Sequence, residues 1–80
     1  MKTAYFVYLL KCADGTYYCG ITTDVARRVE EHNTSPKGAK YTKGRRPVVL
    51  VCKKKYKNRA EASKEEARIK KLKKEEKIAL

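Results

Sequence analysis

Two runs of aromatic and β-branched residues near the amino terminus, separated by a turn signal, constrain the fold most strongly. The first run covers residues 4–12 (AYFVYLLKC) and the second covers residues 16–22 (TYYCGIT). Both compositions are typical of β-strands, and the Asp14-Gly15 pair between them is a strong hairpin signal. We therefore predict a hairpin at the start of the chain. Gly20 in the returning strand indicates a bulge or a close approach to the backbone.

A helix is expected directly after the hairpin. Thr22, Thr23 and Asp24 are candidate caps for the first turn of this helix, and Asp24 adds a negative charge there. Val25 and Val29 are one turn apart and are expected to face the core. The helix should end within residues 33–38, where Asn, Ser, Pro and Gly cluster.

The second half of the chain predicts one further strand and two helices. Residues 47–52 (PVVLVC) are a continuous apolar run and predict a buried central strand, which Pro47 can only begin. Asn58 and Glu61 have the spacing of a capping box for a second helix. Residues 73–80 predict a third short helix. The apolar stripe of the second helix consists of Ala62, Ile69 and Leu72.

The resulting order β-β-α-β-α-α predicts an α+β fold, with a small three-stranded antiparallel sheet flanked by helices. The 80 residues suffice for one small domain, so we expect residues 1–80 to form a single domain. No apolar run is long enough to span a membrane, and the amino terminus lacks the cleavage site of a secretory signal. The 3 cysteines include no CxxC pair, which argues against a disulfide framework or a zinc site and favours the reducing cytoplasm.

Positive charge is concentrated in two segments. The chain has 21 Lys and Arg against 9 Asp and Glu, a net charge of +12, which favours a polyanionic partner such as nucleic acid. Residues 1–36 are balanced, whereas residues 37–46 (KGAKYTKGRR) contain five basic residues and no acidic residue, and residues 53–80 contain twelve basic and five acidic residues. A solvated, solubilising surface would account for a lysine-rich helix, but the acid-free loop is better suited to phosphate contacts.

Two groups of side chains are candidates for chemistry, namely the tyrosines of the hairpin and a pair of glutamates. Neighbouring residues of a strand point to opposite faces, so one tyrosine from each strand can lie on the same face of the sheet. Such a pair could take part in chemistry, or it could serve only as amphipathic packing on a small sheet. On the second helix, Glu65 lies on the apolar stripe and Glu66 at its edge. Burial of a carboxylate is costly unless a cationic side chain, a metal ion or a cleft accompanies it. Alternatively, the two glutamates belong to a solvated run of charged residues. The hairpin tyrosines are Tyr5, Tyr8, Tyr17 and Tyr18.

Four segments together resemble the GIY-YIG nuclease superfamily. Residues 6–10 (FVYLL) and 17–22 (YYCGIT), whose tyrosines Tyr8 and Tyr18 are ten positions apart, resemble its two-part signature, although the first part reads Phe-Val-Tyr and lacks its glycine. Residues 24–32 (DVARRVEEH) resemble its first helix and residues 66–72 (EARIKKL) its glutamate-bearing helix. The similarity covers most of the chain. It is strongest to small stand-alone members from bacteria and some viruses, whose basic loop is also similar.

The resemblance implies a set of catalytic residues. The two motif tyrosines, the arginine and the histidine fall on Tyr8, Tyr18, Arg28 and His32. The metal-binding glutamate falls on Glu66, whereas the helical stripe alone favours Glu65, so both glutamates stay candidates. The asparagine found late in many larger members has no counterpart after Leu72.

The chemistry that the resemblance implies is metal-dependent hydrolysis of phosphodiester bonds in nucleic acid, with DNA favoured over RNA and with structured or single-stranded DNA included. Glu66 would hold Mg²⁺ or Mn²⁺, which stabilises the leaving oxygen. Arg28 would bind the scissile phosphate, and Tyr8 would act as the general base once nearby cations lower its pKa. Tyr18 and His32 would position the phosphate or water, and His32 could assist proton transfer.

The basic loop is expected to contact flanking phosphates, and Tyr41 within it to stack on an unpaired base. A chain of 80 residues leaves no room for a targeting domain, so we expect low sequence specificity or a protein partner that supplies it. Two alternatives remain: a non-catalytic nucleic-acid-binding module on the same fold, and a structural protein that binds polyanions. The candidate binding residues of the loop are Lys40, Tyr41, Lys43, Arg45 and Arg46.

Overall fold

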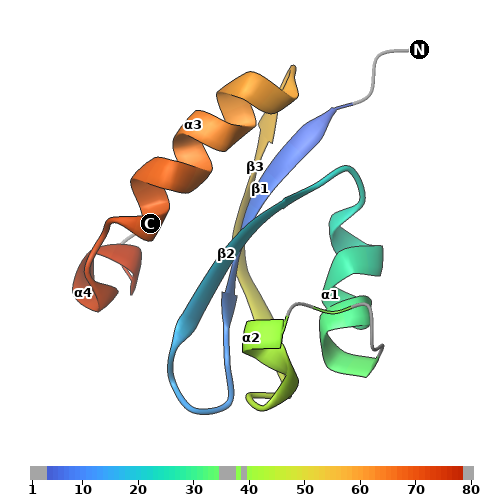
Figure 1. Ribbon diagram of the computed structural model, residues 1–80, viewed down its shortest axis with the longest axis vertical. Helices are drawn as coiled ribbons and strands as arrows, with labels where there is room; N and C mark the ends of the chain where they lie inside the picture. The colour runs from blue at the N-terminus through green and yellow to red at the C-terminus, as the bar shows by residue number, and fades with distance from the viewer. Residues whose placement is uncertain (1–3, 35–37, 39, 79–80) are drawn as a thin grey trace.

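The chain adopts the predicted β-β-α-β-α-α order, with one additional short helix in the basic loop (Figure 1). The computed structural model describes residues 4–34, 38 and 40–78, so Lys37 of the basic loop and the end of the predicted helix over 73–80 lie outside the described residues. The elements are β1 (Tyr5–Lys11), β2 (Tyr17–Thr22), α1 (Val25–Thr34), α2 (Lys40–Lys43), β3 (Val49–Tyr56), α3 (Arg59–Lys70) and α4 (Lys74–Ile78).

The three strands form an antiparallel sheet in the order β2-β1-β3. The first strand is therefore the central one, and the prediction that residues 47–52 form a buried central strand is wrong. Val49 and Val51 in β3 are 57% and 41% exposed, because β3 pairs on one side only. A continuous apolar run predicts a strand, but it does not reveal the strand's position in the sheet.

Alternation along β1 divides the apolar core into two layers. Val7 and Leu9 face α3, whereas Tyr8 and Leu10 face α1. Figure 1 shows α3 on one side of the sheet and α1 and α2 on the other. The α3 layer also contains Cys19, Ala62 and Ile69. The α1 layer also contains Cys12, Val25 and Val48.

Local side-chain contacts start the two longer helices as predicted. The Asp24 carboxylate accepts a hydrogen bond from the Arg27 amide at 3.1 Å, and the Asn58 side chain accepts one from the Glu61 amide at 2.9 Å. Such caps satisfy amide groups that lack a partner within the first turn. Among the helices described, none combines the length and the apolar character that crossing a bilayer requires. All three cysteines are unpaired.

Candidate active site

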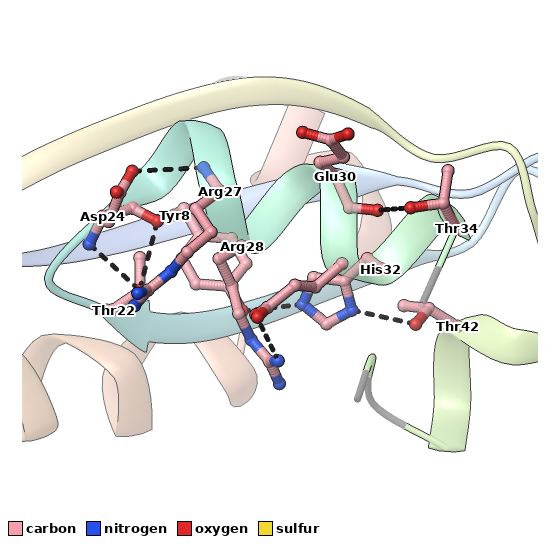
Figure 2. A network of polar contacts seen from close by, with 10 residues as sticks. Tyr8, Thr22, Asp24, Arg27, Arg28, Glu30, His32, Thr34 and Thr42 are labelled. Carbon is pink, nitrogen blue, oxygen red and sulfur yellow. Dashed lines mark hydrogen bonds and ion pairs between the residues drawn. The ribbon is translucent and has the colours of Figure 1, made fainter. Parts of the chain in front are cut away.

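Tyr8 and His32 meet in the interior on the α1 side of the sheet (Figure 2). The Tyr8 hydroxyl lies 2.8 Å from His32 Nε2, and Nδ1 of the same imidazole lies 2.9 Å from Thr42 Oγ1. All three side chains are fully buried. Since a neutral imidazole has one donor and one acceptor nitrogen, His32 connects β1 to α2 through one donated and one accepted hydrogen bond.

Gly20 makes room for the Tyr8 ring on the neighbouring strand. Tyr8 and Gly20 are paired across the hairpin, and a Cβ atom at position 20 would lie 2.4 Å from the Tyr8 hydroxyl oxygen. The close approach that the glycine predicted is thus confirmed, and the approaching group is the candidate catalytic tyrosine. The pairing of β1 with β2 is continuous through this position, so the glycine marks no bulge.

Arg28 brings a positive charge to the Tyr8 hydroxyl. The guanidinium interacts with the hydroxyl and opposes the effect of burial on its pKa, and Arg28 Nη1 forms an ion pair of 3.1 Å with Glu31 on the same helix. Figure 2 shows Arg28 and His32 extending from the same face of α1. A quarter of the Arg28 side chain, 26%, is exposed, so an anionic group of a substrate can reach it from solvent.

Burial sets the protonation states of Tyr8 and His32. It raises the pKa of Tyr8 to about 12, and the opposing effect of Arg28 is smaller. The expectation that nearby cations lower the pKa of Tyr8 is therefore wrong for the protein alone, since desolvation outweighs them. Burial and then the charge of Arg28 lower the pKa of His32 to about 4. At neutral pH the phenol therefore keeps its proton, and the imidazole is uncharged.

Tyr18 and Tyr41 extend the site by a row of aromatic rings. The Tyr18 ring lies 5.2 Å from the His32 ring and 6.5 Å from the Tyr8 ring, between centroids. The Tyr41 ring stacks on Tyr18 at 5.8 Å with an interplanar angle of 28°. Tyr41 is 38% exposed, so it has a packed side and a side open to solvent.

The two arginines of the basic loop bind other parts of the protein. Arg45 Nε pairs with Asp14 of the hairpin turn at 2.9 Å, and Nη1 donates to the Tyr41 carbonyl at 2.8 Å. Its guanidinium lies 4.1 Å from the centre of the Tyr41 ring. Arg46 donates to the His32 carbonyl at 2.5 Å. These arginines therefore fasten the loop to the hairpin and to α1, while Lys40 and Lys43 are exposed.

The two glutamates of α3 have different surroundings. Glu65 accepts a hydrogen bond of 2.7 Å from Tyr56 of β3 and pairs with Arg68 and Lys54, so it belongs to a structural network on the β3 side. The expectation that at least one of the two glutamates has a cationic neighbour is confirmed.

Glu66 lies on the side of α3 that faces β2. Its carboxylate is 3.5 Å from Lys70 Nζ, and its charge adds to burial in raising the pKa of Cys19 to about 11. Cys19 directly follows Tyr18 in β2. Among the residues that the structure describes, Glu66 has its ion pair with Lys70 and no ion pair with Arg28. The structure thus brings four predicted residues together, namely Tyr8, Tyr18, Arg28 and His32. It does not bring Glu66 to them, since α3 covers the other side of the sheet (Figure 1).

Thr42 is a site residue that sequence reasoning missed. A threonine among lysines and arginines carries no signal that its hydroxyl is buried against an imidazole ten residues earlier. The same holds for the anchoring of Arg45, since its partner Asp14 is 31 residues away along the chain.

The comparison with protein families decides the membership of the chain. A family model described as the GIY-YIG catalytic domain matches residues 4–79. The chain belongs to the GIY-YIG family. This is a family of the nuclease type, and the resemblance seen in the four motif segments is confirmed.

Relatives of this GIY-YIG chain occur in bacteria and archaea under the name UPF0213. The UPF0213 protein of Desulfotalea psychrophila is 58% identical over 71 residues, which cover 89% of this chain but only 64% of that relative's length. The UPF0213 protein of Halobacterium salinarum is 53% identical over 74 residues, covering 92% of this chain and 95% of the relative.

Solved structures share the fold of the GIY-YIG chain. The solution structure of an E. faecalis protein is 44% identical, covers 98% of this chain and 82% of its own, and superposes with a TM-score of 0.67. The UPF0213 protein of Bacillus halodurans, also 44% identical, covers 92% of this chain and 78% of its own with a TM-score of 0.57.

Proposed function

We propose that the protein is a metal-dependent nuclease that hydrolyses phosphodiester bonds in nucleic acid, with DNA preferred over RNA and with low intrinsic sequence specificity. The observation that carries this proposal is the contact of the Tyr8 hydroxyl with both His32 and Arg28. A proton donor and acceptor and a phosphate-binding cation thus surround one buried hydroxyl. Three unpaired cysteines suit a reducing compartment, so we place the activity in the cytoplasm.

Arg28 is the group suited to hold the scissile phosphate. Its planar guanidinium matches the geometry of two phosphate oxygens. Glu31 fixes the orientation of the side chain through an ion pair of 3.1 Å. Because the guanidinium is positioned before the substrate binds, the positive charge needs little rearrangement as negative charge develops on the phosphate oxygens.

Tyr8 and His32 form the proton path of the proposal. A phenol with a pKa of about 12 is ionised to only about one part in 10⁵ at pH 7. Tyr8 therefore accepts the proton of the attacking water as it passes its own proton to the uncharged Nε2 of His32, 2.8 Å away. The water oxygen bonds to phosphorus while the bond to the leaving oxygen breaks. The Nδ1–H group of His32 then donates to Thr42.

The cofactor of the proposal is Mg²⁺, with Mn²⁺ as a substitute. Among the described residues no group of three or more His, Cys, Asp or Glu could hold a metal ion. Mg²⁺ does not require such a group, since it often takes one or two carboxylates together with water and phosphate oxygens. The half-buried carboxylate of Glu66 beside β2 fits this pattern, and a bound ion would stabilise charge on the leaving oxygen.

Nicking of supercoiled plasmid DNA tests the proposal. We expect the purified protein to nick DNA with Mg²⁺ or Mn²⁺ and not with EDTA. Tyr8→Phe and Glu66→Gln should each reduce the rate at least 100-fold, because one removes the transferred proton and the other the metal ligand. Lys64→Gln, on the exposed surface of α3, is the control and should nick normally. Equal nicking by wild type and Tyr8→Phe would refute the role of Tyr8.

A non-catalytic nucleic-acid-binding module is the second candidate function. The ion pair between Glu66 and Lys70 favours it, because a lysine occupies the carboxylate that the metal needs. This alternative predicts binding of DNA without cleavage under any divalent metal. Tight binding by a protein that never nicks would therefore select it over the nuclease.

A further inference from the structure

We propose that a cavity between the hairpin, α2 and α4 binds one unpaired base of the substrate strand. The cavity has a volume of about 190 Å³ and is lined by Thr16, Tyr17, Tyr41 and Lys77. The inference rests on the proposed function in that it takes nucleic acid as the ligand. It adds the substrate class, which is single-stranded or locally unpaired nucleic acid.

The lining of the cavity has the chemistry of a nucleotide site. The Tyr17 ring offers a surface on which any base can stack, and the Tyr41 ring, which already contacts Tyr18 and Arg45, borders the cavity. The Lys77 ammonium can pair with the phosphate attached to that base. Thr16 donates its hydroxyl proton to Asp14 at 2.6 Å. The Thr16 oxygen therefore keeps lone pairs that can accept a hydrogen bond from an N–H group of a base edge.

A row of aromatic contacts connects the cavity to the candidate active site. Tyr41 lines the cavity and stacks on Tyr18 at 5.8 Å, and Tyr18 lies 5.2 Å from His32. Tyr17 and Tyr18 are neighbours in β2 and point to opposite faces, so the cavity lies around the open edge of that strand. If Arg28 holds one phosphate of a nucleic-acid strand, the neighbouring nucleotides of that nucleic acid would lie along the open edge of β2.

The walls of the cavity are fixed by a single carboxylate. Asp14 accepts hydrogen bonds from the Thr16 amide and hydroxyl, and it pairs with Arg45. Arg45 in turn lies over the Tyr41 ring and donates to the Tyr41 carbonyl. Thr16 and Tyr41 are therefore ordered before a ligand arrives, which reduces the entropy lost on binding.

An unpaired base is required because a paired base is already stacked within its duplex. Only an extruded or single-stranded base can lie on the Tyr17 ring within this cavity. Single-stranded nucleic acid should therefore bind more tightly than a duplex of the same sequence.

Fluorescence anisotropy in EDTA tests this site without any cleavage. The probes are a labelled single-stranded octanucleotide, its duplex, and an abasic chain with the same number of phosphates. We expect the base-containing single strand to bind roughly 5- to 150-fold more tightly than the abasic chain, the range for stacking of one base. If the wild-type protein binds the base-containing single strand and the abasic chain with equal affinity, the proposal is overturned.

Substitutions then locate the effect. Tyr41→Leu and Tyr17→Leu should each abolish the preference for bases over the abasic chain, whereas Tyr41→Phe should keep it. Lys77→Gln should weaken binding more than Lys64→Gln, which removes the same charge away from the cavity. If Tyr41→Leu weakens binding to the base-containing and abasic chains equally, the site is excluded.

The two proposals can fail separately. The binding experiment needs no metal and no cleavage, so a protein that never nicks DNA can still show the base preference. A protein that nicks DNA but binds both chains equally would keep the nuclease function and lose the base site.

Discussion

At the scale of single residues, Tyr8 depends on three neighbours that differ in kind. Gly20 leaves the space for its ring, His32 provides a partner for its hydroxyl, and Arg28 brings a positive charge. A buried hydroxyl without a hydrogen bond would be costly. The packing that positions the phenol also raises its pKa, so the phenol does not ionise by itself at neutral pH. In the proposed mechanism its proton passes to His32, the hydrogen-bond partner of the hydroxyl.

Gly20→Ala tests the space beside Tyr8. The new methyl group would lie 2.4 Å from the Tyr8 hydroxyl oxygen, and the buried ring would have to move away from His32. We expect a loss of about 1–3 kcal/mol in the free energy of unfolding and a strong loss of nicking. Gly44→Ala is the matched control, since a Cβ atom there meets nothing within 4 Å. Similar stability of both variants in urea would show that the ring has room to shift.

The pH dependence of stability tests the burial of His32. Its pKa is lowered from 6.5 to about 4 in the folded protein, so the unfolded chain binds more protons between these values. The stabilisation is present above pH 6.5 and is lost as the pH falls towards 4. We expect a loss of up to about 3 kcal/mol between pH 7 and 4.5, measured by urea unfolding. His32→Gln should flatten this dependence, and an equally steep profile in the variant would assign it to other groups.

At the scale of elements, α3 separates two carboxylates that are adjacent in sequence. Glu65 joins Tyr56, Arg68 and Lys54 towards β3, whereas Glu66 lies with Lys70 towards β2. Consecutive helical residues point in directions about 100° apart, so one helix can bind the sheet with one glutamate towards β3 and place the other towards β2.

Alanine substitutions of the two glutamates should therefore have different effects on stability. Glu65→Ala removes the hydrogen bond from Tyr56 and two ion pairs, and we expect it to cost about 1 kcal/mol, which lowers the melting temperature by roughly 4–8 °C in a chain of this size. Glu66→Ala should stay within about 0.5 kcal/mol of wild type. Thermal unfolding by circular dichroism measures both, and a larger loss for Glu66→Ala would contradict the assignment of Glu65 as the structural residue.

The sequence predicts the elements better than it predicts their environment. The Asp14-Gly15 turn and the Asn58 cap depend on neighbours along the chain, so local rules identify them. The edge position of β3 depends on which strand pairs with β1, and an apolar run does not encode it. The motif order identified the residues around Tyr8. The burial that raises the pKa of Tyr8, and the partners of Arg45 and His32, come from contacts distant in sequence.

At the scale of the whole molecule, the sheet separates a structural face from a candidate catalytic face. The α3 layer buries aliphatic residues, whereas the α1 layer buries Tyr8 and His32 among its apolar side chains. The net charge of +12 surrounds both layers and attracts a polyanion without selecting a sequence. Discrimination among nucleic acids must therefore come from shape, and the cavity at the edge of β2 is a feature that can provide it.

The opposite edge of the sheet has a consequence for the protein at high concentration. Strand β3 exposes Val49, Leu50 and Val51 and then continues into Lys53–Lys55, and its pairing with β1 is irregular at Leu9/Leu10. Lysines and irregularities on an open edge prevent another chain from adding to it. Acetylation of these lysines would remove that protection, and the exposed valines would then favour intermolecular sheet growth and fibrils.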